Sequence, residues 1–191
     1  EYVVIITATD DGSGNLTDTQ TLTVTVTDVN EAPVITSASS VSFAENSTST
    51  VITVTSSDVD SDAVTYGISG TDADDFNINS SSGALTFKTL PNYESPTDSD
   101  TDREYVIIIT ATDDGSGNLT DTQTLTVTVT DVNDNPVVTA GGTLEYTENS
   151  NATAIDINIT ISDQDDVQLS GATATISSGF TTGDVLFLTT Q

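Results

Sequence analysis

Acidic side chains in this sequence gather in short runs whose spacing suits metal binding. Asp58 and Asp60 are separated by one residue, and Asp131–Pro136 combines carboxylates with amides before a proline. A near copy of that joint, Asp28–Pro33, occurs earlier in the chain. The sequence has no Cys and no His, so it lacks the usual nitrogen and sulfur ligands of zinc and copper. The remaining donors are oxygens, which bind hard cations such as Ca²⁺.

The charge of the chain restricts its partners. Asp and Glu number 30 against 2 Lys and Arg, which gives a formal net charge of -28. Nucleic acids and anionic membrane surfaces are bound through Lys and Arg, so neither is an expected partner. No apolar run reaches the length of a membrane span, so we expect no direct membrane insertion. Close carboxylates repel one another until a cation neutralises them, which favours calcium ions as the partner.

The sequence is internally repeated. Residues 1–33 return as residues 104–136 with substitutions at only three positions, which predicts a tandem array. We therefore divide the chain into the C-terminal part of one repeat (1–33), a complete repeat (34–136) and the N-terminal part of a further repeat (137–191).

The elements that must position the acids are β-strands. In residues 122–131, Leu125, Val127 and Val129 alternate with threonines, which predicts a strand with one buried face. The strand that begins at Tyr105 alternates in the same way, and the turn residues between the two strands predict a hairpin. Further strands are expected near residues 51–55, 63–68, 76–79 and 84–89 and within 171–191, with no helix. Several short strands in about one hundred residues predict an all-β fold built from β-sandwiches.

The strand register places carboxylates where the core columns end. Val54 points into the predicted core and Asp58 and Asp60 continue its phase, as Asp113 continues that of Ala111. The isoleucines at alternate positions from 155 to 161 precede Asp163 and Asp165 in the same way. One pole of a sandwich would thus present several carboxylates, and Ca²⁺ takes six to eight oxygens at about 2.3–2.6 Å.

Four of these motifs, in this order, resemble those of cadherin repeats. The joints DVNEAP and DVNDNP resemble the family's DxNDxxP linker, and Glu45 of FAEN, the DxD of Asp58 and Asp60, and Asp113 of ATDDG match its other signatures. The resemblance implies tandem Greek-key, Ig-like β-sandwich repeats in an elongated rod, with Ca²⁺ between neighbouring repeats of the chain. The near-identical copies and the acid content are similar to those of large bacterial surface adhesins, which implies an extracellular, cell-surface location.

The resemblance also implies a ligand set for each joint. For the joint before the complete repeat the set is Asn30, Glu31, the Ala32 carbonyl, Asp58, Asp60 and Asp113. For the joint after it the set is Glu45, Asn92, Glu94, Asp131, the Val132 carbonyl, Asn133, Asp134, the Asn135 carbonyl, Asp163 and Asp165. Two positions depart from the family pattern, because Asn92 replaces an acid and Glu31 replaces an aspartate. Residues 102–104 spell the family's DRE motif, but they abut the next strand, so that role is assigned to Glu94.

The hypothesis that follows is a calcium-rigidified structural or adhesion module of a large surface protein, without enzymatic activity. The alternatives are a module that binds polysaccharide or a like repeat on another cell-surface protein, and an appendage of an enzyme whose catalytic part lies elsewhere. The aromatic residues are expected in the core rather than on a sugar-binding face; they are Tyr66, Phe76, Phe87, Tyr93 and Tyr105. The acid cluster Asp98–Asp102 is interpreted as an exposed insertion loop rather than a site.

Overall fold

β-Strands make up nearly all of the regular structure in the computed structural model, which describes residues 1–147, 150–179, 181–182 and 185. The chain divides into two units, Glu1–Thr130 and Asp131–Gln191, and each is described by itself. One 3₁₀ turn, η1 (Ala73–Asp75), accompanies the strands of the described residues. No helix in this described part has the length and apolar character needed to cross a bilayer.

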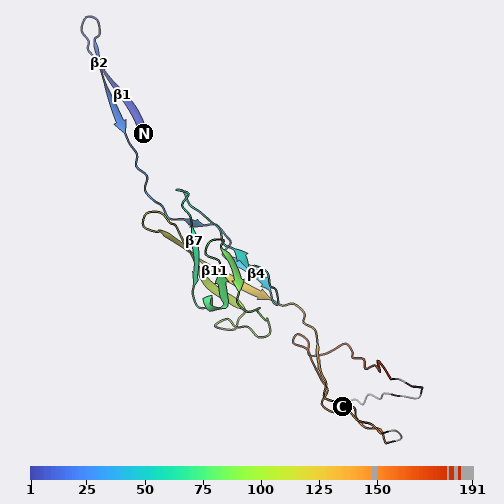
Figure 1. Ribbon diagram of the computed structural model, residues 1–191. Coiled ribbons are helices and arrows are strands. Elements are labelled where there is room, and N and C mark those ends of the chain that lie inside the picture. Colours follow the sequence, from blue (N-terminus) through green and yellow to red (C-terminus); the bar gives the residue numbers. More distant parts are fainter. Residues whose placement is uncertain (148–149, 180, 183–184, 186–191) are drawn as a thin grey trace. The chain divides into compact units, whose positions relative to one another are not determined.

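The first unit begins with an antiparallel hairpin of β1 (Tyr2–Thr9) and β2 (Thr17–Val24), drawn in blue in Figure 1. Every residue of both strands is solvent-exposed, although their sequence alternates between apolar and polar side chains. The alternation therefore predicts the strands correctly, while burial of the apolar face needs a second layer.

Residues 34–130 form the sandwich in the centre of Figure 1, with a four-stranded sheet as its larger layer. The strand order is β4 (Ser40–Ala44), β11 (Thr120–Thr130), β10 (Glu104–Thr112) and β7 (Thr65–Ser69). The strand β10 pairs antiparallel with both β11 and β7, whereas β4 pairs parallel to β11. The first long strand of the sandwich thus lies beside its last.

The smaller layer consists of two short sheets. They are β5 (Ile52–Thr53), β9 (Ala84–Phe87) and β8 (Phe76–Ile78) in one sheet, and β3 (Val34–Ile35) with β6 (Ser56–Ser57) in the other. The layers meet through aromatic rings, since the Tyr105 ring lies edge-on to those of Phe76 and Phe87 at centroid distances of 5.8 and 5.1 Å. Such edge-to-face pairs add to the stability of an apolar core. The predicted β-sandwich is confirmed.

The core contains the residues that the alternation predicts. Ile107, Ile109 and Leu125 are almost completely buried, and Val54 is also in the core. The five aromatic residues expected in the core are buried or packed against it, as predicted. The predicted strands at 51–55, 63–68, 76–79 and 84–89 are present with bounds that differ by a few residues.

The second unit has less regular structure than expected. Its described strands are β12 (Val137–Thr139) and β13 (Thr160–Ser162), paired antiparallel. The predicted core column is wrong, because Ile155, Ile157 and Ile159 are 60%, 76% and 55% exposed. Two three-residue strands offer too little surface to bury that column. No strand is present at the described positions of 171–191, and the other positions of that range lie outside the described residues.

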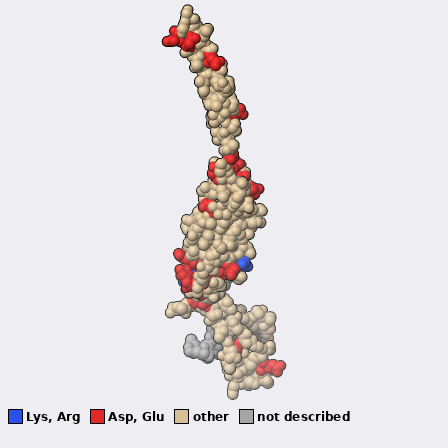
Figure 2. All heavy atoms as spheres, turned by 90° about the vertical axis from the view of Figure 1, so that its left-hand side faces the viewer, with Lys and Arg blue, Asp and Glu red and all other residues tan. Residues whose placement is uncertain are grey.

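The sandwich of residues 34–130 has two poles. The N-terminal pole is the end where β3 begins, and it also holds the β10–β11 turn. The C-terminal pole is the opposite end, where β11 finishes and β10 starts, because Glu104 pairs with Thr128 in the antiparallel ladder. Acidic side chains gather toward both poles and leave the middle of the sandwich mostly free of them in Figure 2.

Candidate metal centre

Three carboxylates come together at the N-terminal pole just after β6. Asp58, Asp60 and Asp62 are half-buried, and each places one carboxylate oxygen within 4.8 Å of the others. The loop is shaped by Asp58, whose Oδ1 accepts hydrogen bonds from the backbone N–H of Asp60 (2.9 Å) and Asp62 (3.4 Å). Asp58 Oδ2 is screened from solvent without a hydrogen-bond donor in the described structure. A buried carboxylate oxygen without a donor is favourable only if something positive satisfies it.

Asp113 supplies a fourth carboxylate from the end of β10. Its side chain is buried, and Oδ1 accepts hydrogen bonds from the N–H groups of Gly115 (3.1 Å) and Leu119 (3.0 Å). Asp113 Oδ2 accepts a hydrogen bond from Asn30 Nδ2 at 3.1 Å. The side chain therefore holds the hairpin turn with one oxygen and meets the preceding joint with the other.

The joint that precedes β3 contacts both the Asp58–Asp62 loop and the turn that begins at Asp113. Asn30 Nδ2 also donates to the Ser116 carbonyl (3.3 Å), and the Glu31 N–H donates to Asp60 Oδ2 (2.8 Å). Asn30 Oδ1 and Asp62 Oδ2 both approach Gly115 so closely that a Cβ there would collide with them. The structure thus brings Asn30, Glu31, Asp58, Asp60 and Asp113 together at this pole, while their role as metal ligands stays a prediction.

The negative charges of the carboxylates at this pole repel one another. The nearby Asp60 carboxylate, followed by partial loss of water, raises the pKa of Glu31 above its ordinary value. Partial loss of water, followed by the Asp58 carboxylate, raises the pKa of Asp62. Repulsion between carboxylates contributes to both shifts, and a divalent cation would relieve it. The donors are oxygens throughout, which fits Ca²⁺ rather than a softer metal.

Asp62 is a candidate ligand that the prediction left out. The family motif ends at the second aspartate, so the ligand set implied for this joint does not include Asp62. The signal that identifies it is the continued alternation Asp58-x-Asp60-x-Asp62. With Ser61 in a left-handed conformation (φ 70°), the loop turns and brings the third carboxylate to the first two.

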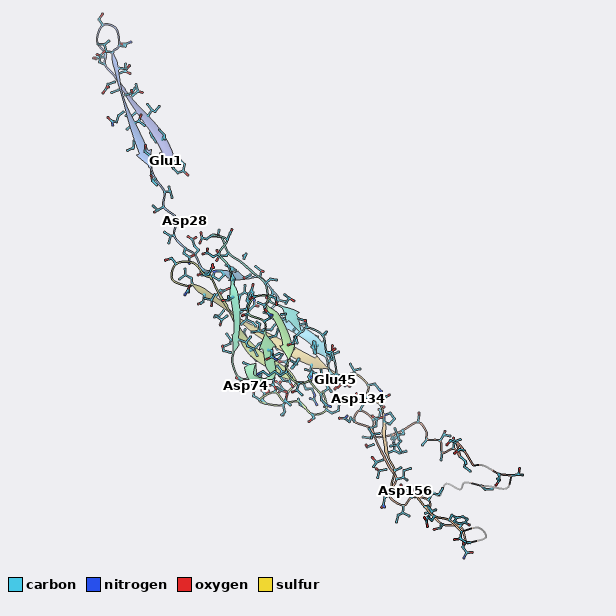
Figure 3. The ribbon with its side chains drawn as sticks, in the orientation of Figure 1. Glu1, Asp28, Glu45, Asp74, Asp134 and Asp156 are labelled. Carbon is cyan, nitrogen blue, oxygen red and sulfur yellow. The ribbon has the colours of Figure 1, made fainter. Side chains whose placement is uncertain are left out.

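The C-terminal pole holds the first unit's share of the second ligand set. Glu45 is 2% exposed; its N–H donates to the Thr130 carbonyl (3.0 Å), and its Oε2 accepts from the Tyr93 N–H (2.7 Å). Asn92 Oδ1 accepts a hydrogen bond from the Ser95 N–H at 2.6 Å, and Glu94 is half-buried. Figure 3 shows Glu45 at this pole.

The second unit repeats part of the arrangement seen at the first joint. Asp163 Oδ1 accepts hydrogen bonds from the N–H groups of Asp165 (3.0 Å) and Asp166 (3.1 Å), as Asp58 does from its own loop. The Asp134 N–H donates to Asp165 Oδ2, as the Glu31 N–H donates to Asp60. Asn133 Nδ2 donates to the Asp134 carbonyl at 2.9 Å. The predicted ligand role of every joint residue stays a prediction, including those of Ala32, Asp131, Val132 and Asn135.

The interpretation of residues 98–102 as an exposed loop is wrong for its first residue. Asp98 is only 3% exposed, and Asp98, Asp100 and Asp102 form a further group of three carboxylates within 4.8 Å. Neighbouring side chains cover Asp98 because Asp72, itself buried, accepts hydrogen bonds from the N–H groups of Ser99 (2.9 Å) and Val106 (2.7 Å). Sequence alone gave no indication of this fold-back.

Residues 39–130 match the family model of the cadherin domain. Among solved structures, the protocadherin gammaB7 EC3-6 cis-dimer is 31% identical, with a TM-score of 0.57 over 75% of this chain and 36% of that one. Extracellular cadherin domains 3–6 of protocadherin gamma B2 are 28% identical, with a TM-score of 0.58 and the same coverage. The extracellular domain of protocadherin gammaB4 is 31% identical, with a TM-score of 0.55 over 75% of this chain and 24% of that one.

The chain thus spans about a third or less of the length of these structures. No curated protein matches it. Together, the family model and the solved structures confirm a cadherin-like fold for the sandwich, as the order of its motifs predicted.

Proposed function

We propose that this chain is a calcium-rigidified structural and adhesion module of a large cell-surface or secreted adhesin, with Ca²⁺ bound where one repeat joins the next. The observation that carries the proposal is the docking of the joint at Asn30 and Glu31 onto the carboxylates of Asp58, Asp60 and Asp113. Cadherin domains are an adhesion family, and the sandwich shares their fold.

The carboxylates at the N-terminal pole would hold the joint in place by binding a shared Ca²⁺ ion. Asp58 Oδ2 is a buried oxygen already positioned by the loop, and Asp60 and Asp113 each face the joint. Bound Ca²⁺ would supply the positive charge that these carboxylates lack. Without a cation, repulsion between Glu31 and Asp60 weakens the attachment of the joint. We propose Asp62 as an additional ligand, because its carboxylate belongs to the same group.

The same proposal extends to the second joint. Each unit by itself has part of the ligand set in place: Glu45 is buried and hydrogen-bonded in the first unit, while Asp134 and Asp165 are hydrogen-bonded in the second. Asn92 in place of an acid removes one negative charge, so we expect weaker calcium binding at the second joint than at the first.

The proposal is tested by hydrogen exchange of the full chain in calcium and in chelator. We expect calcium to slow exchange of the Glu31 amide, with half-saturation at about 10⁻⁴–10⁻³ M as in extracellular calcium modules. The variant Asp60→Asn should abolish that protection, whereas Asp74→Asn should keep it, since Asp74 is an exposed acid at the other pole. Equal exchange and equal small-angle scattering with and without calcium would overturn the proposal.

A second candidate function is self-association. It is favoured by the similarity to the protocadherin gammaB7 structure, which is a cis-dimer. Sedimentation equilibrium of the full chain in calcium would show a concentration-dependent dimer if this chain associates in the same way, and a monomer at all concentrations if it does not.

A further inference from the structure

The loop between Pro91 and β10 holds a second group of three carboxylates that the joints do not use. Asp98, Asp100 and Asp102 alternate in sequence, and each offers an oxygen within 4.8 Å of the other two. The loop lies at the C-terminal pole, because it immediately precedes Glu104 at the start of β10. All three residues belong to one loop of one repeat, and none belongs to either ligand set of the joints.

The first carboxylate of the group is buried and incompletely satisfied. Asp98 is 3% exposed. Its Oδ2 accepts hydrogen bonds from the N–H groups of Asp102 (2.8 Å) and Arg103 (3.4 Å). Its Oδ1 is screened from water and has no hydrogen-bond donor among the described residues. The side chain lies within hydrogen-bonding range of the Asp100 carboxyl, which has no proton to offer when ionised. A buried oxygen in that position requires a positive partner.

The loop has the same construction as the Asp58–Asp62 loop at the opposite pole. In each, the first aspartate accepts a hydrogen bond from the N–H of the third and keeps its other oxygen buried without a donor. In each, the residue before the third aspartate is left-handed, with φ 70° at Ser61 and 60° at Thr101. The two loops have unrelated flanking sequences, so the shared construction is not inherited from the repeat.

The Arg103 guanidinium, which follows the group in sequence, makes its described contacts with Tyr93. The Arg103 guanidinium lies over the Tyr93 ring, with Cζ 4.3 Å from its centroid, and Nε donates to the Tyr93 carbonyl at 2.8 Å. Arg103 itself has φ 73°, at the sixth position counted from Asp98. Calcium loops with acids at positions one, three and five place a sharp turn at that same sixth position.

Hydrogen bonds also hold the loop that contains Asp98, Asp100 and Asp102 against β10 and the residues around it. Asp72 is 3% exposed and bonds the N–H groups of Ser99 and Val106, which fixes the loop against β10. Thr97 donates to Asp75 Oδ1, and its N–H donates to the Tyr105 hydroxyl, both at 3.1 Å. The carboxylates are thus held in place before any cation arrives, which lowers the entropy cost of binding.

We propose that Asp98, Asp100 and Asp102 form a calcium site within the repeat, separate from the joints. It takes a hard divalent cation through carboxylate oxygens, with Asp98 Oδ1 as the buried ligand. The site needs no neighbouring repeat, so it binds calcium whether or not the joints are intact. Its consequence is that calcium further stabilises the long connection into β10 at the C-terminal pole.

The test is an amide chemical-shift titration of the full chain with CaCl₂ after removal of divalent ions. The amides of Asp102 and Arg103 report on this site, and that of Glu31 reports on the first joint. We expect the Asp102 and Arg103 signals to shift with calcium in the wild type. In Asp100→Asn, half-saturation of those signals should need more than about tenfold higher calcium, because even residues that only support a metal site alter affinity by about 10–100-fold.

Matched variants separate this site from the joints. Asp74→Asn removes the same charge from an exposed residue outside the group, and it should leave all the signals as in the wild type. Asp60→Asn should weaken only the Glu31 response. The Ile107 and Leu125 amides, both in the core, should keep their positions in Asp100→Asn if the sandwich is folded.

The outcomes distinguish the two proposals. If Glu31 responds to calcium while Asp102 and Arg103 do not, or if Asp100→Asn behaves as the wild type, the loop site is overturned and the joint proposal stands. If the loop responds and Glu31 does not, the joint proposal fails alone, and if no amide responds, both fail. A response of the loop to MgCl₂ at lower concentrations than to CaCl₂ would overturn its assignment to calcium.

Discussion

The hairpins of residues 1–33 and 104–136 are nearly the same sequence in two different surroundings. Their pairing is identical, since Tyr2 faces Val24 as Tyr105 faces Val127. Their exposure is not: Tyr2 is 66% exposed and Tyr105 is 1%. Local sequence therefore determines the strands and their register, while the rest of the sandwich determines burial.

The acidic turn of each hairpin also has a local structure that is the same in both copies and surroundings that differ. Asp10 Oδ1 accepts hydrogen bonds from Gly12 (3.1 Å) and Leu16 (3.0 Å), the same turn that Asp113 forms in the second copy. Only Asp113 is also met by Asn30, and only Asp113 is buried. The aspartate of this motif thus stabilises the hairpin turn in both copies. It becomes part of a candidate metal site only where a joint and a DxD loop contact it.

The largest difference between the copies should appear in core truncations. Leu125→Ala removes a side chain that is 0% exposed, so we expect a loss of about 2–5 kcal/mol in the free energy of unfolding. Leu22→Ala truncates the equivalent residue, which is 48% exposed, and should change that free energy by no more than about 0.5 kcal/mol. Urea denaturation followed by tyrosine fluorescence measures both. Equal losses would show that the first hairpin is buried in solution.

The next largest difference between the two copies is expected in how the same substitution changes the calcium affinity of the chain. Asp113→Asn removes a carboxylate at the proposed joint site, so we expect calcium affinity to fall by more than about tenfold in isothermal titration. Asp10→Asn makes the same change in the first copy, where Asn30 is not in contact, and should leave the affinity for the described joint unchanged. A similar loss in both variants would remove the distinction between the two turns.

A smaller effect is expected from the glycine within each acidic turn, two residues after the aspartate. Gly115→Ala would force a Cβ into Asn30 Oδ1 and Asp62 Oδ2, so we expect it to displace the joint and to destabilise the fold by about 1–3 kcal/mol. At Gly12 the nearest atom to such a Cβ is Asp10 Oδ1 at 3.4 Å, an ordinary contact. Thermal unfolding of Gly115→Ala and Gly12→Ala measures the difference; if Gly115→Ala melts as the wild type does, the described approach of Asn30 to the turn is incorrect.

The smallest effect is a pH dependence confined to the completed site. Partial loss of water and the Asp58 carboxylate raise the pKa of Asp62 in the folded chain, and Asp60 raises that of Glu31. A carboxyl with a raised folded pKa contributes stability at low pH and loses it as the pH rises through that pKa. In chelator, the melting temperature should therefore increase as the pH falls from about 6 to about 4. Asp62→Asn should reduce that increase, and an unchanged slope would contradict the repulsion at this pole.

Most of the sandwich could be predicted from sequence because its signal is local. Alternation in 122–131 and the turn before it specify a hairpin whose apolar face is indeed buried. The joint at Asn30, the DxD loop and Asp113 could be placed together because strand phase carries the core column to one pole. The column at Ile155–Ile161 failed for the reverse reason, since alternation says nothing about whether a facing sheet exists.

The parts of the site that sequence missed depend on contacts between distant segments. Asp98 is covered because Asp72, more than twenty residues earlier, holds its loop against β10. The sequence pattern indicates no partner for Arg103, yet its guanidinium packs on the Tyr93 ring, ten residues before it. Asp62 lies outside the two-acid motif of the family, so the resemblance assigns it no role, although it continues the same alternation.

The parallel pairing of β4 with β11 has a mechanical consequence. The five paired positions join the first long strand of the sandwich to its last, and the chain enters β4 from the N-terminal pole and leaves β11 at the C-terminal pole. A force that pulls the two poles apart therefore loads the whole ladder in shear, so its hydrogen bonds must break together rather than one after another. Tension along the chain meets a high barrier in this arrangement, which suits a link that has to carry load.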